Sequence, residues 1–151
     1  MIKVYFDGAC EPVNPGGFAS YGLVIFCSYH GELYRTSKLF RPIKGHERET
    51  SNNVAEYSAF LHALEWLDKN AYNDEKIIFF GDSKLVIEQM FGSWKMRGGF
   101  YIPIALKAKQ LLKKFTNITG QWIPREQNDI ADKLSKESLI EAGVKFKIQP
   151  I

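Results

Sequence analysis

The run Ile77-Ile78-Phe79-Phe80 is the part of this sequence that most restricts the possible folds. Four consecutive β-branched and aromatic residues, inside the segment Lys76–Gly81, are typical of a strand that is buried on both faces. Such a strand needs apolar cover on each side of its sheet, and helices supply that cover in α/β proteins. We therefore expect an α/β fold with helices on both faces of a sheet.

The other segments predict the order β-β-β-α-β-α-α-β-α along the chain. Hydrophobic patterning and turn residues indicate strands at Ile2–Phe6, Gly17–Ser28, Gly31–Phe40, Lys76–Gly81 and Ile118–Ile123. The same criteria indicate helices at Asn52–Lys69, Ser83–Met90, Ile104–Phe115 and Asn128–Leu139. The first three strands should form antiparallel hairpins, whereas the later βα units favour parallel, right-handed crossovers. Together they predict a mixed sheet.

The length of the chain suits one domain over residues 1–151, whose tail 143–151 either docks on the core or pairs with a strand edge. Apolar runs such as Leu23–Cys27 are too short to cross a bilayer, and the N-terminus lacks the pattern of a signal peptide. Cys10 and Cys27 form neither a CxxC pair nor a zinc pattern, so we expect two reduced thiols. We accordingly expect a cytoplasmic protein without a membrane partner.

Charge is distributed unevenly, although the net charge of +3 is mild. The stretch from Phe91 to Arg125 contains no acidic residue and seven basic ones, namely Lys95, Arg97, Lys107, Lys109, Lys113, Lys114 and Arg125. Such an asymmetry suits a partner with a phosphate backbone. A solvated helix face would have a similar composition, so this feature alone does not distinguish the two interpretations.

Two aspartates stand where predicted strands end. Asp7 follows Ile2–Phe6, and Asp82 follows Lys76–Gly81. If the two strands are adjacent and parallel, both carboxylates emerge at the edge of the sheet where α/β proteins place their chemistry. Taken singly, each is equally well a turn residue or, for Asp82, a helix N-cap. The pair is what suggests a site.

Glu56 and Asp132 are two further acidic candidates on predicted helices. Asn53 and Glu56 have the spacing of a capping box, which is the simplest interpretation of Glu56. However, Glu56 also begins a helical stripe of apolar residues, and a carboxylate facing a core is costly unless it is paired or bound to metal. Asp132, considered alone, is an ordinary acid on a helix surface.

Four segments in this order, YFDG with NPGG, NNVAEY, FGDSKLVIEQ and WIPREQNDIADKLS, resemble type 1 ribonuclease H over nearly the whole chain. The resemblance implies the ribonuclease H-like fold, with a five-stranded mixed sheet. It also implies that Asp7, Glu56, Asp82 and Asp132 are catalytic and bind metal. The implied activity is metal-dependent endonucleolytic cleavage of the RNA strand of RNA/DNA hybrids, which leaves 5′-phosphate and 3′-hydroxyl ends.

The chemistry of phosphodiester hydrolysis explains why acids are needed. Two Mg²⁺ ions about 3.5–4 Å apart can activate water and neutralise the charge that develops on the phosphate. Mg²⁺ prefers hard oxygen ligands, and we expect Mn²⁺ to substitute for it. In this arrangement Asp7 bridges the ions, with Glu56 and Asp82 on one side and Asp132 on the other. Without metal, the four acids should repel one another and titrate as a coupled set.

Recognition of RNA requires contacts to the 2′-hydroxyl in the wide minor groove. The loop Asn14-Pro15-Gly16-Gly17 offers a side-chain amide and an approachable backbone, so we expect it to bind substrate. Asn52 and Asn53 lie one helical turn before Glu56 and should contact the strand that is cut, and Ser51 is a candidate for a phosphate pocket. For all of these residues, turn formation or helix capping is the simpler interpretation. Double-stranded RNA is a further candidate substrate, and we expect a monomer.

The sequence departs from the better-studied bacterial members of this family in two places. Those members carry a histidine in the loop before the last acid, whereas this loop reads PREQND, so Arg125 or Asn128 is the candidate replacement. Their basic, tryptophan-bearing protrusion is shortened here. Trp94, Lys95 and Arg97 are either its remnant or merely a helix end and connector. Without a separate hybrid-binding domain, binding should be modest and sensitive to salt.

Two other functions are compatible with parts of the pattern. An integrase- or transposase-like nucleotidyl transferase core uses three acids, but it normally needs flanking DNA-binding domains, and the NPGG and NNVAE segments fit hybrid recognition better. A non-catalytic nucleic-acid-binding module is the other alternative. The presence of all four acids argues against a decayed site of that kind.

Overall fold

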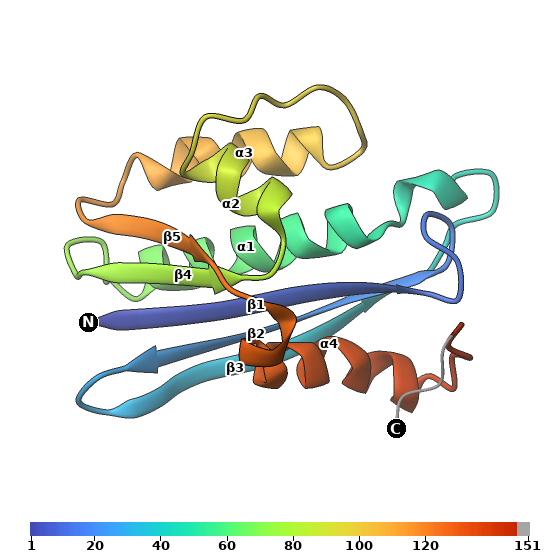
Figure 1. Cartoon of the computed structure of the whole chain (residues 1–151), viewed down its shortest axis with the longest axis horizontal. Helices are drawn as coiled ribbons and strands as arrows, with labels where there is room; N and C mark the ends of the chain where they lie inside the picture. Colours follow the sequence, from blue (N-terminus) through green and yellow to red (C-terminus); the bar gives the residue numbers. More distant parts are fainter. Residues whose placement is uncertain (148–151) are drawn as a thin grey trace.

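The five strands lie side by side in the order β3-β2-β1-β4-β5 (Figure 1), in a computed structural model that describes residues 1–147. They are β1 (Ile2–Glu11), β2 (Phe18–Cys27), β3 (Gly31–Phe40), β4 (Ile77–Gly81) and β5 (Ile118–Trp122). The β1–β2 and β2–β3 pairs are antiparallel, whereas the β1–β4 and β4–β5 pairs are parallel. The expected mixed sheet is thus confirmed.

Helices cover both faces of this sheet. They are α1 (Asn52–Lys69), α2 (Lys84–Met90), α3 (Ile102–Leu112) and α4 (Asp129–Glu141), with short 3₁₀ helices η1 (Glu47–Glu49) and η2 (Arg125–Gln127). α1 packs on β1 and β2, and α3 packs on α1, whereas α4 packs on β1, β2 and β3. Because side chains alternate along a strand, Phe6 faces α1, where it contacts Phe60, and its neighbour Asp7 points toward the face that α4 covers.

The main core lies between the sheet and α1. The Phe60 ring packs against Phe6 at 5.7 Å and against Phe79 at 4.7 Å between ring centroids. On this face Ile77 and Phe79 of β4 are buried, as the apolar run predicts.

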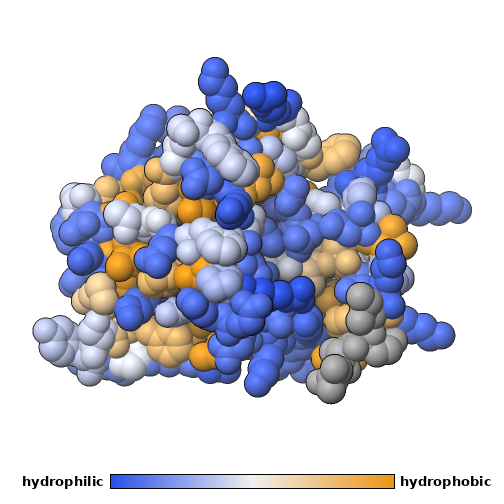
Figure 2. Space-filling view, in the orientation of Figure 1, coloured by the Kyte–Doolittle hydropathy of each residue, from blue (hydrophilic) through white to orange (hydrophobic). Residues whose placement is uncertain are grey.

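The prediction that β4 is buried on both faces is wrong for the second face. Ile78 and Phe80 are only partly buried there, and Phe80 stacks on Tyr5 of β1 with ring centroids 4.9 Å apart. The reason is that α4 packs mainly on β1, β2 and β3 and covers little of β4. Figure 2 shows apolar residues gathered over the strands on the left half of this face.

β1 is longer than expected, so Asp7 lies inside a strand and does not follow one. The parallel pairing with β4 ends at Tyr5, opposite Phe80, but the antiparallel pairing with β2 continues to Glu11, opposite Phe18. Polar and glycine residues after Phe6 suggested a turn, yet one bonded edge is sufficient to keep the backbone extended. Asp7 therefore projects from a paired strand at the point where its other neighbour, β4, has ended.

α4 lies close against the sheet at Gly22 of β2. A Cβ atom placed on Gly22 would lie 2.6 Å from the carbonyl oxygen of Ala131 and 2.6 Å from the backbone nitrogen of Ser135. Because both atoms belong to the α4 backbone, no side-chain rotation can relieve this contact. Because Gly22 has no side chain, α4 can pack directly against the backbone of β2. This short distance between helix and sheet also determines the position of Asp132.

We expect Gly22→Ala to destabilise the protein by about 3 kcal/mol, because the added methyl group forces α4 away from β2. Urea unfolding would measure this loss. Gly31→Ala is the matched control, since Gly31 has open space around it and only its φ of 75° opposes a side chain. A loss at Gly22 no larger than that at Gly31 would contradict the tight packing of α4.

The remaining features concern the chain end, the thiols and the membrane. Residues 143–147 turn back on the body of the protein, with Phe146 buried and the Lys147 backbone N–H donating to Glu11 Oε2 at 3.0 Å; residues 148–151 of the predicted tail lie outside the described part. Cys10 and Cys27 are free thiols at opposite ends of the β1–β2 hairpin. Within residues 1–147, no helix is long and apolar enough to span a membrane.

Candidate active site

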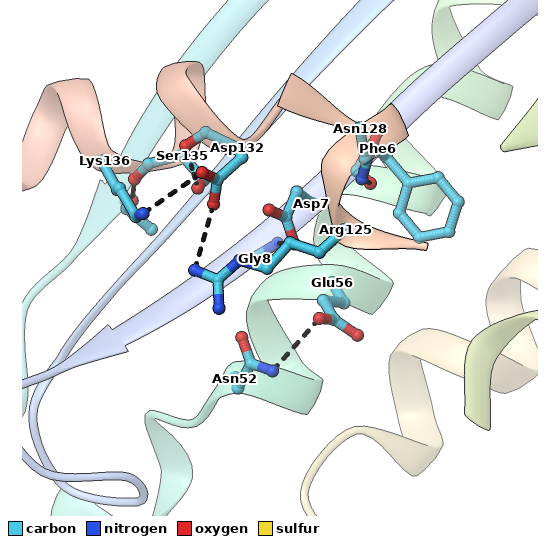
Figure 3. A network of polar contacts seen from close by, with 11 residues as sticks. Phe6, Asp7, Gly8, Asn52, Glu56, Arg125, Asn128, Asp132, Ser135 and Lys136 are labelled. Atoms are coloured by element: carbon cyan, nitrogen blue, oxygen red, sulfur yellow. Dashed lines mark hydrogen bonds and ion pairs between the residues drawn. The ribbon is translucent and has the colours of Figure 1, made fainter. Parts of the chain in front are cut away.

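Three of the four predicted acids converge at the edge of the sheet. Oxygen atoms of Asp7 in β1, Glu56 in α1 and Asp82 after β4 all lie within 4.8 Å of one another. Asp132, in the first turn of α4, is also close enough to Asp7 to interact with it electrostatically. Figure 3 shows Asp7 between Asp132 and Glu56, with the side chains coming from a strand and from two helices. The parallel β1–β4 pair thus places Asp7 beside Asp82, and the packing of α1 on β1 adds Glu56.

The structure does not support helix capping as the role of Glu56 or Asp82, because neighbouring serines cap these helices. Ser51 is the N-cap of α1, where its hydroxyl accepts a hydrogen bond from the Val54 N–H at 3.1 Å. Ser83 caps α2 in the same way through the Val86 N–H, at 3.3 Å. Glu56 and Asp82 are therefore not needed to satisfy helix ends.

Burial and mutual repulsion strongly disfavour ionisation of the acids when no cation is present. Asp7 is only 5% exposed, and burial, followed by the charges of Asp82, Glu56 and Asp132, raises its pKa to about 9. Glu56 is 4% exposed, and burial is the main cause that raises its pKa to about 7. Burial also raises the pKa of Asp82. A cluster of this kind is costly unless a positive charge joins it.

The donor set fits a hard divalent cation. Glu56 Oε1 accepts a hydrogen bond from Asn52 Nδ2 at 3.1 Å, but Glu56 Oε2 is buried and has no hydrogen-bond partner among the described residues. Buried polar atoms are rarely left unpaired in native proteins, and an oxygen of this kind is available as a metal ligand. Carboxylate oxygens at this spacing are the ligands that Mg²⁺ and Mn²⁺ prefer.

Asp132 differs from the other acids because both of its oxygens have basic partners. Arg125 Nη2 lies 3.4 Å from Asp132 Oδ1, and Lys136 Nζ lies 3.2 Å from Asp132 Oδ2. Both cations line the same cavity as the acids. Sequence reasoning missed Lys136, although its i,i+4 spacing from Asp132 on a helix was a usable signal.

The two segments predicted to bind substrate are joined to each other beside the acids. The Asn52 N–H donates to Asn14 Oδ1 at 3.0 Å, and the Gly16 N–H donates to the carbonyl oxygen of Thr50 at 2.9 Å. Asn14, Asn52 and Asn53 line the acidic cavity, whose volume is about 350 Å³. The loop therefore lies against the start of α1.

Other predicted residues of these segments lie outside the cavity lining. Pro15 is exposed and Gly16 is partly buried with a φ of 107°, whereas Gly17 is buried, with its N–H bonded to the Val13 carbonyl oxygen. Ser51 is engaged as the α1 cap. These four residues shape the turn and the helix start, and Asn14 is the member of the loop that reaches the cavity.

The auxiliary candidates separate into three places. Arg125 lines the acidic cavity. Asn128 is buried, and its side-chain amide donates to the carbonyl oxygen of Phe6 at 2.9 Å, so it ties η2 to β1. Trp94, Lys95 and Arg97 line a different cavity next to α2.

Trp122 is a further residue beside the acids that sequence reasoning did not select. Its indole N–H donates to the backbone carbonyl oxygen of Asp82 at 3.0 Å, while the Lys84 ammonium lies 5.0 Å from the centre of its ring. The indole remains 41% exposed. Trp122 thus fixes the backbone that carries the Asp82 carboxylate.

We expect Trp122→Phe to weaken the apparent affinity for Mg²⁺ by about tenfold, because loss of the N–H frees the Asp82 backbone. A titration of the thermal stability of the protein against Mg²⁺ concentration would measure the shift. Trp94→Phe, also at an exposed indole but remote from Asp82, should leave the Mg²⁺ midpoint unchanged. Equal midpoints for Trp122→Phe and the parent protein would contradict this role.

Comparison with known proteins agrees with the geometry. The family profile described as "Reverse transcriptase-like" matches residues 6–138. The bifunctional protein Rv2228c of Mycobacterium tuberculosis is 33% identical over 142 residues, which are 94% of this chain but 36% of that protein. Ribonuclease HI of Halobacterium salinarum is 31% identical and is covered over 65% of its length. The chain thus spans about a third of the mycobacterial protein.

Two solved structures are similar over nearly their whole length. The N-terminal RNase H domain of Rv2228c superposes with a TM-score of 0.80 at 30% identity, covering 94% of this chain and 95% of that one. LC11-RNase H1, solved in complex with an RNA/DNA hybrid, gives a TM-score of 0.78 at 30% identity, covering 94% and 99%.

Proposed function

The chain belongs to the type 1 ribonuclease H family, and from this premise we propose that it is a metal-dependent endonuclease that hydrolyses the RNA strand of RNA/DNA hybrids. The observation that carries the proposal is the convergence of Asp7, Glu56 and Asp82 within 4.8 Å, on a cavity that Asp132 also lines. The similarity to a ribonuclease H bound to a hybrid supports the choice of substrate.

The proposed reaction is a two-metal hydrolysis that leaves 5′-phosphate and 3′-hydroxyl ends. Asp7, Glu56 and Asp82 would hold one Mg²⁺ or Mn²⁺ ion, and Asp7 with Asp132 would hold a second. When bound, the ions supply a nucleophilic water and neutralise charge on the phosphate. The chain's own part is to fix the carboxylates on paired backbone and capped helices. In addition, Arg125 and Lys136 hold the Asp132 carboxylate at the cavity wall.

Asn14, Asn52 and Asn53 are proposed to contact the RNA strand. All three line the cavity beside the acids, and amide side chains can both donate to and accept from a 2′-hydroxyl. The hydrogen bond from the Asn52 N–H to Asn14 fixes the loop against the start of α1. These asparagines are thereby held at a fixed distance from Glu56, which lies one turn further along α1. A DNA strand lacks the 2′-hydroxyl, so these contacts would favour cleavage of RNA.

The function is tested by incubating the protein with labelled RNA/DNA hybrid, double-stranded RNA and double-stranded DNA, each with Mg²⁺ or Mn²⁺. We expect cleavage of the RNA strand of the hybrid, new 3′-hydroxyl ends, and complete loss of cleavage in EDTA. Strand joining on DNA would instead indicate a nucleotidyl transferase. Hybrid binding without cleavage would indicate a non-catalytic module.

A further inference from the structure

The segment between α2 and α3 carries exposed cations but has little structure of its own. Residues 91–101, here called the basic connector, form neither helix nor strand, and Trp94, Lys95 and Arg97 are exposed on it. Two of its three glycines, Gly98 and Gly99, adopt φ values of 153° and 130°. Figure 1 shows the basic connector as the loop that arches above α2 and α3, on the side of the molecule away from α4.

A buried amide from α2 holds this connector in its middle and at its C-terminal end. Gln89 is 2% exposed, and its Nε2 donates to the Lys95 carbonyl oxygen at 3.1 Å and to the Tyr101 hydroxyl at 3.1 Å. The same side chain accepts, through Oε1, a hydrogen bond from the Tyr57 hydroxyl at 2.5 Å. Both hydrogens of the amide are therefore used, one on the middle of the connector and one on its last residue.

The anchor of this network lies next to the candidate active site. Tyr57 follows Glu56 directly in α1, is fully buried, and stacks on Tyr101 with ring centroids 5.1 Å apart and planes inclined by 7°. Gln89 thus links the helix that carries Glu56 to the connector that carries the cations. Their common cavity, about 530 Å³, is lined by Leu85, Gln89, Ser93, Trp94, Lys95, Arg97 and Tyr101.

We propose that Gln89 is a positioning residue that holds the basic connector in the conformation in which Lys95 and Arg97 contact the phosphates of the hybrid. The inference rests on the proposed function, and it assigns the connector to substrate binding through a residue that does not contact the substrate. A connector of mostly exposed residues loses much conformational entropy when it is ordered, and the two hydrogen bonds that the Gln89 amide donates to it offset part of that cost. An isosteric side chain without the amide removes these bonds and leaves the cations in place.

The test compares Gln89→Met with the parent in hybrid binding at several salt concentrations, both in an Asp7→Asn background that prevents cleavage. We expect Gln89→Met to bind hybrid about 5- to 20-fold more weakly and to reduce the slope of log K against log salt by about 1–2, because one or two phosphate contacts are lost. The double variant Lys95→Ala/Arg97→Ala should give the same reduction. Adding Gln89→Met to it should cause little further loss.

A second measurement does not depend on the substrate. Hydrogen–deuterium exchange of peptides from residues 91–101 should be faster in Gln89→Met than in the parent. Gln110→Met, the same change at an exposed position of α3, should behave as the parent in both measurements. Parental exchange in Gln89→Met, or weaker binding with an unchanged salt slope, would overturn the proposal. A parent protein that neither binds nor cleaves hybrid would instead overturn the proposed function, while the exchange result still reports on the anchoring.

Discussion

Asp7→Asn is expected to lower hybrid cleavage by roughly 10³-fold or more, the scale observed when one preorganised electrostatic partner is removed from an active site. Asp7 interacts with all three other acids and is assigned to both proposed metal positions, so its loss disrupts both. In EDTA the same substitution should stabilise the protein by on the order of 1–3 kcal/mol near neutral pH, because burial and repulsion disfavour the carboxylate there. Single-turnover cleavage of labelled hybrid and urea unfolding would measure the two effects.

The opposite signs of these effects separate a catalytic acid from a structural one. Asp74→Asn is the matched control, since Asp74 is exposed in the loop that leads into the other end of β4. It should change neither the cleavage rate nor the stability appreciably. If Asp7→Asn kept parental activity, or lost stability in EDTA, the assignment of Asp7 to a metal site would be wrong.

The metal-free protein is expected to lose stability as pH rises, and Mg²⁺ should restore it. Asp7 and Glu56 have folded-state pKa values of about 9 and about 7, above their unfolded values of about 3.9 and 4.3. Their stabilising contribution is therefore fully present below about pH 4 and is lost as pH rises through these folded pKa values. The loss for Glu56 alone is on the order of 3 kcal/mol.

Urea unfolding across this pH range, in EDTA or in saturating Mg²⁺, would measure the effect. Mg²⁺ that binds the folded carboxylates should add about 2.7 kcal/mol at 100 times its Kd, and more at high pH, where protons compete less. Glu56→Gln should flatten the pH dependence in EDTA and reduce the Mg²⁺ effect. A stability that increases from pH 5 to pH 9 without metal would contradict the raised pKa values.

The parts of the fold and the site that depend on local pattern could be predicted from the sequence. The order of strands and helices along the chain and the mixed sheet followed from the apolar runs and turn residues. The convergence of Asp7 with Asp82 was expected on the condition that their strands pair in parallel, as β1 and β4 do. Two local predictions failed because the tertiary partners differed from those assumed. Pairing with β2 extends β1 past Phe6, and α4 leaves the second face of β4 partly exposed.

Residues whose roles depend on distant partners could not be predicted in this way. Gln89 meets Tyr57 and Tyr101, which are 32 and 12 residues away, and the Trp122 indole meets the Asp82 backbone 40 residues away. No periodicity or motif encodes such pairs, because they form only when the helices and strands have packed. Asn128 is the converse case: its position in the loop suggested an auxiliary role, yet its side chain is buried on the Phe6 carbonyl oxygen.

The continuation of β1 beyond the end of β4 also bears on how activity would be lost on heating. Asp7 projects from backbone that is paired with Gly22 in the centre of the sheet, and Gly22 in turn supports the helix that carries Asp132. A site on a loop can unfold locally while the rest of a protein stays folded. Asp7 and Asp132 are instead held by the sheet and by the helix packed on it, so they should be displaced only when the sheet itself unfolds. Heat inactivation should therefore coincide with global unfolding, with no inactive yet folded state at intermediate temperatures.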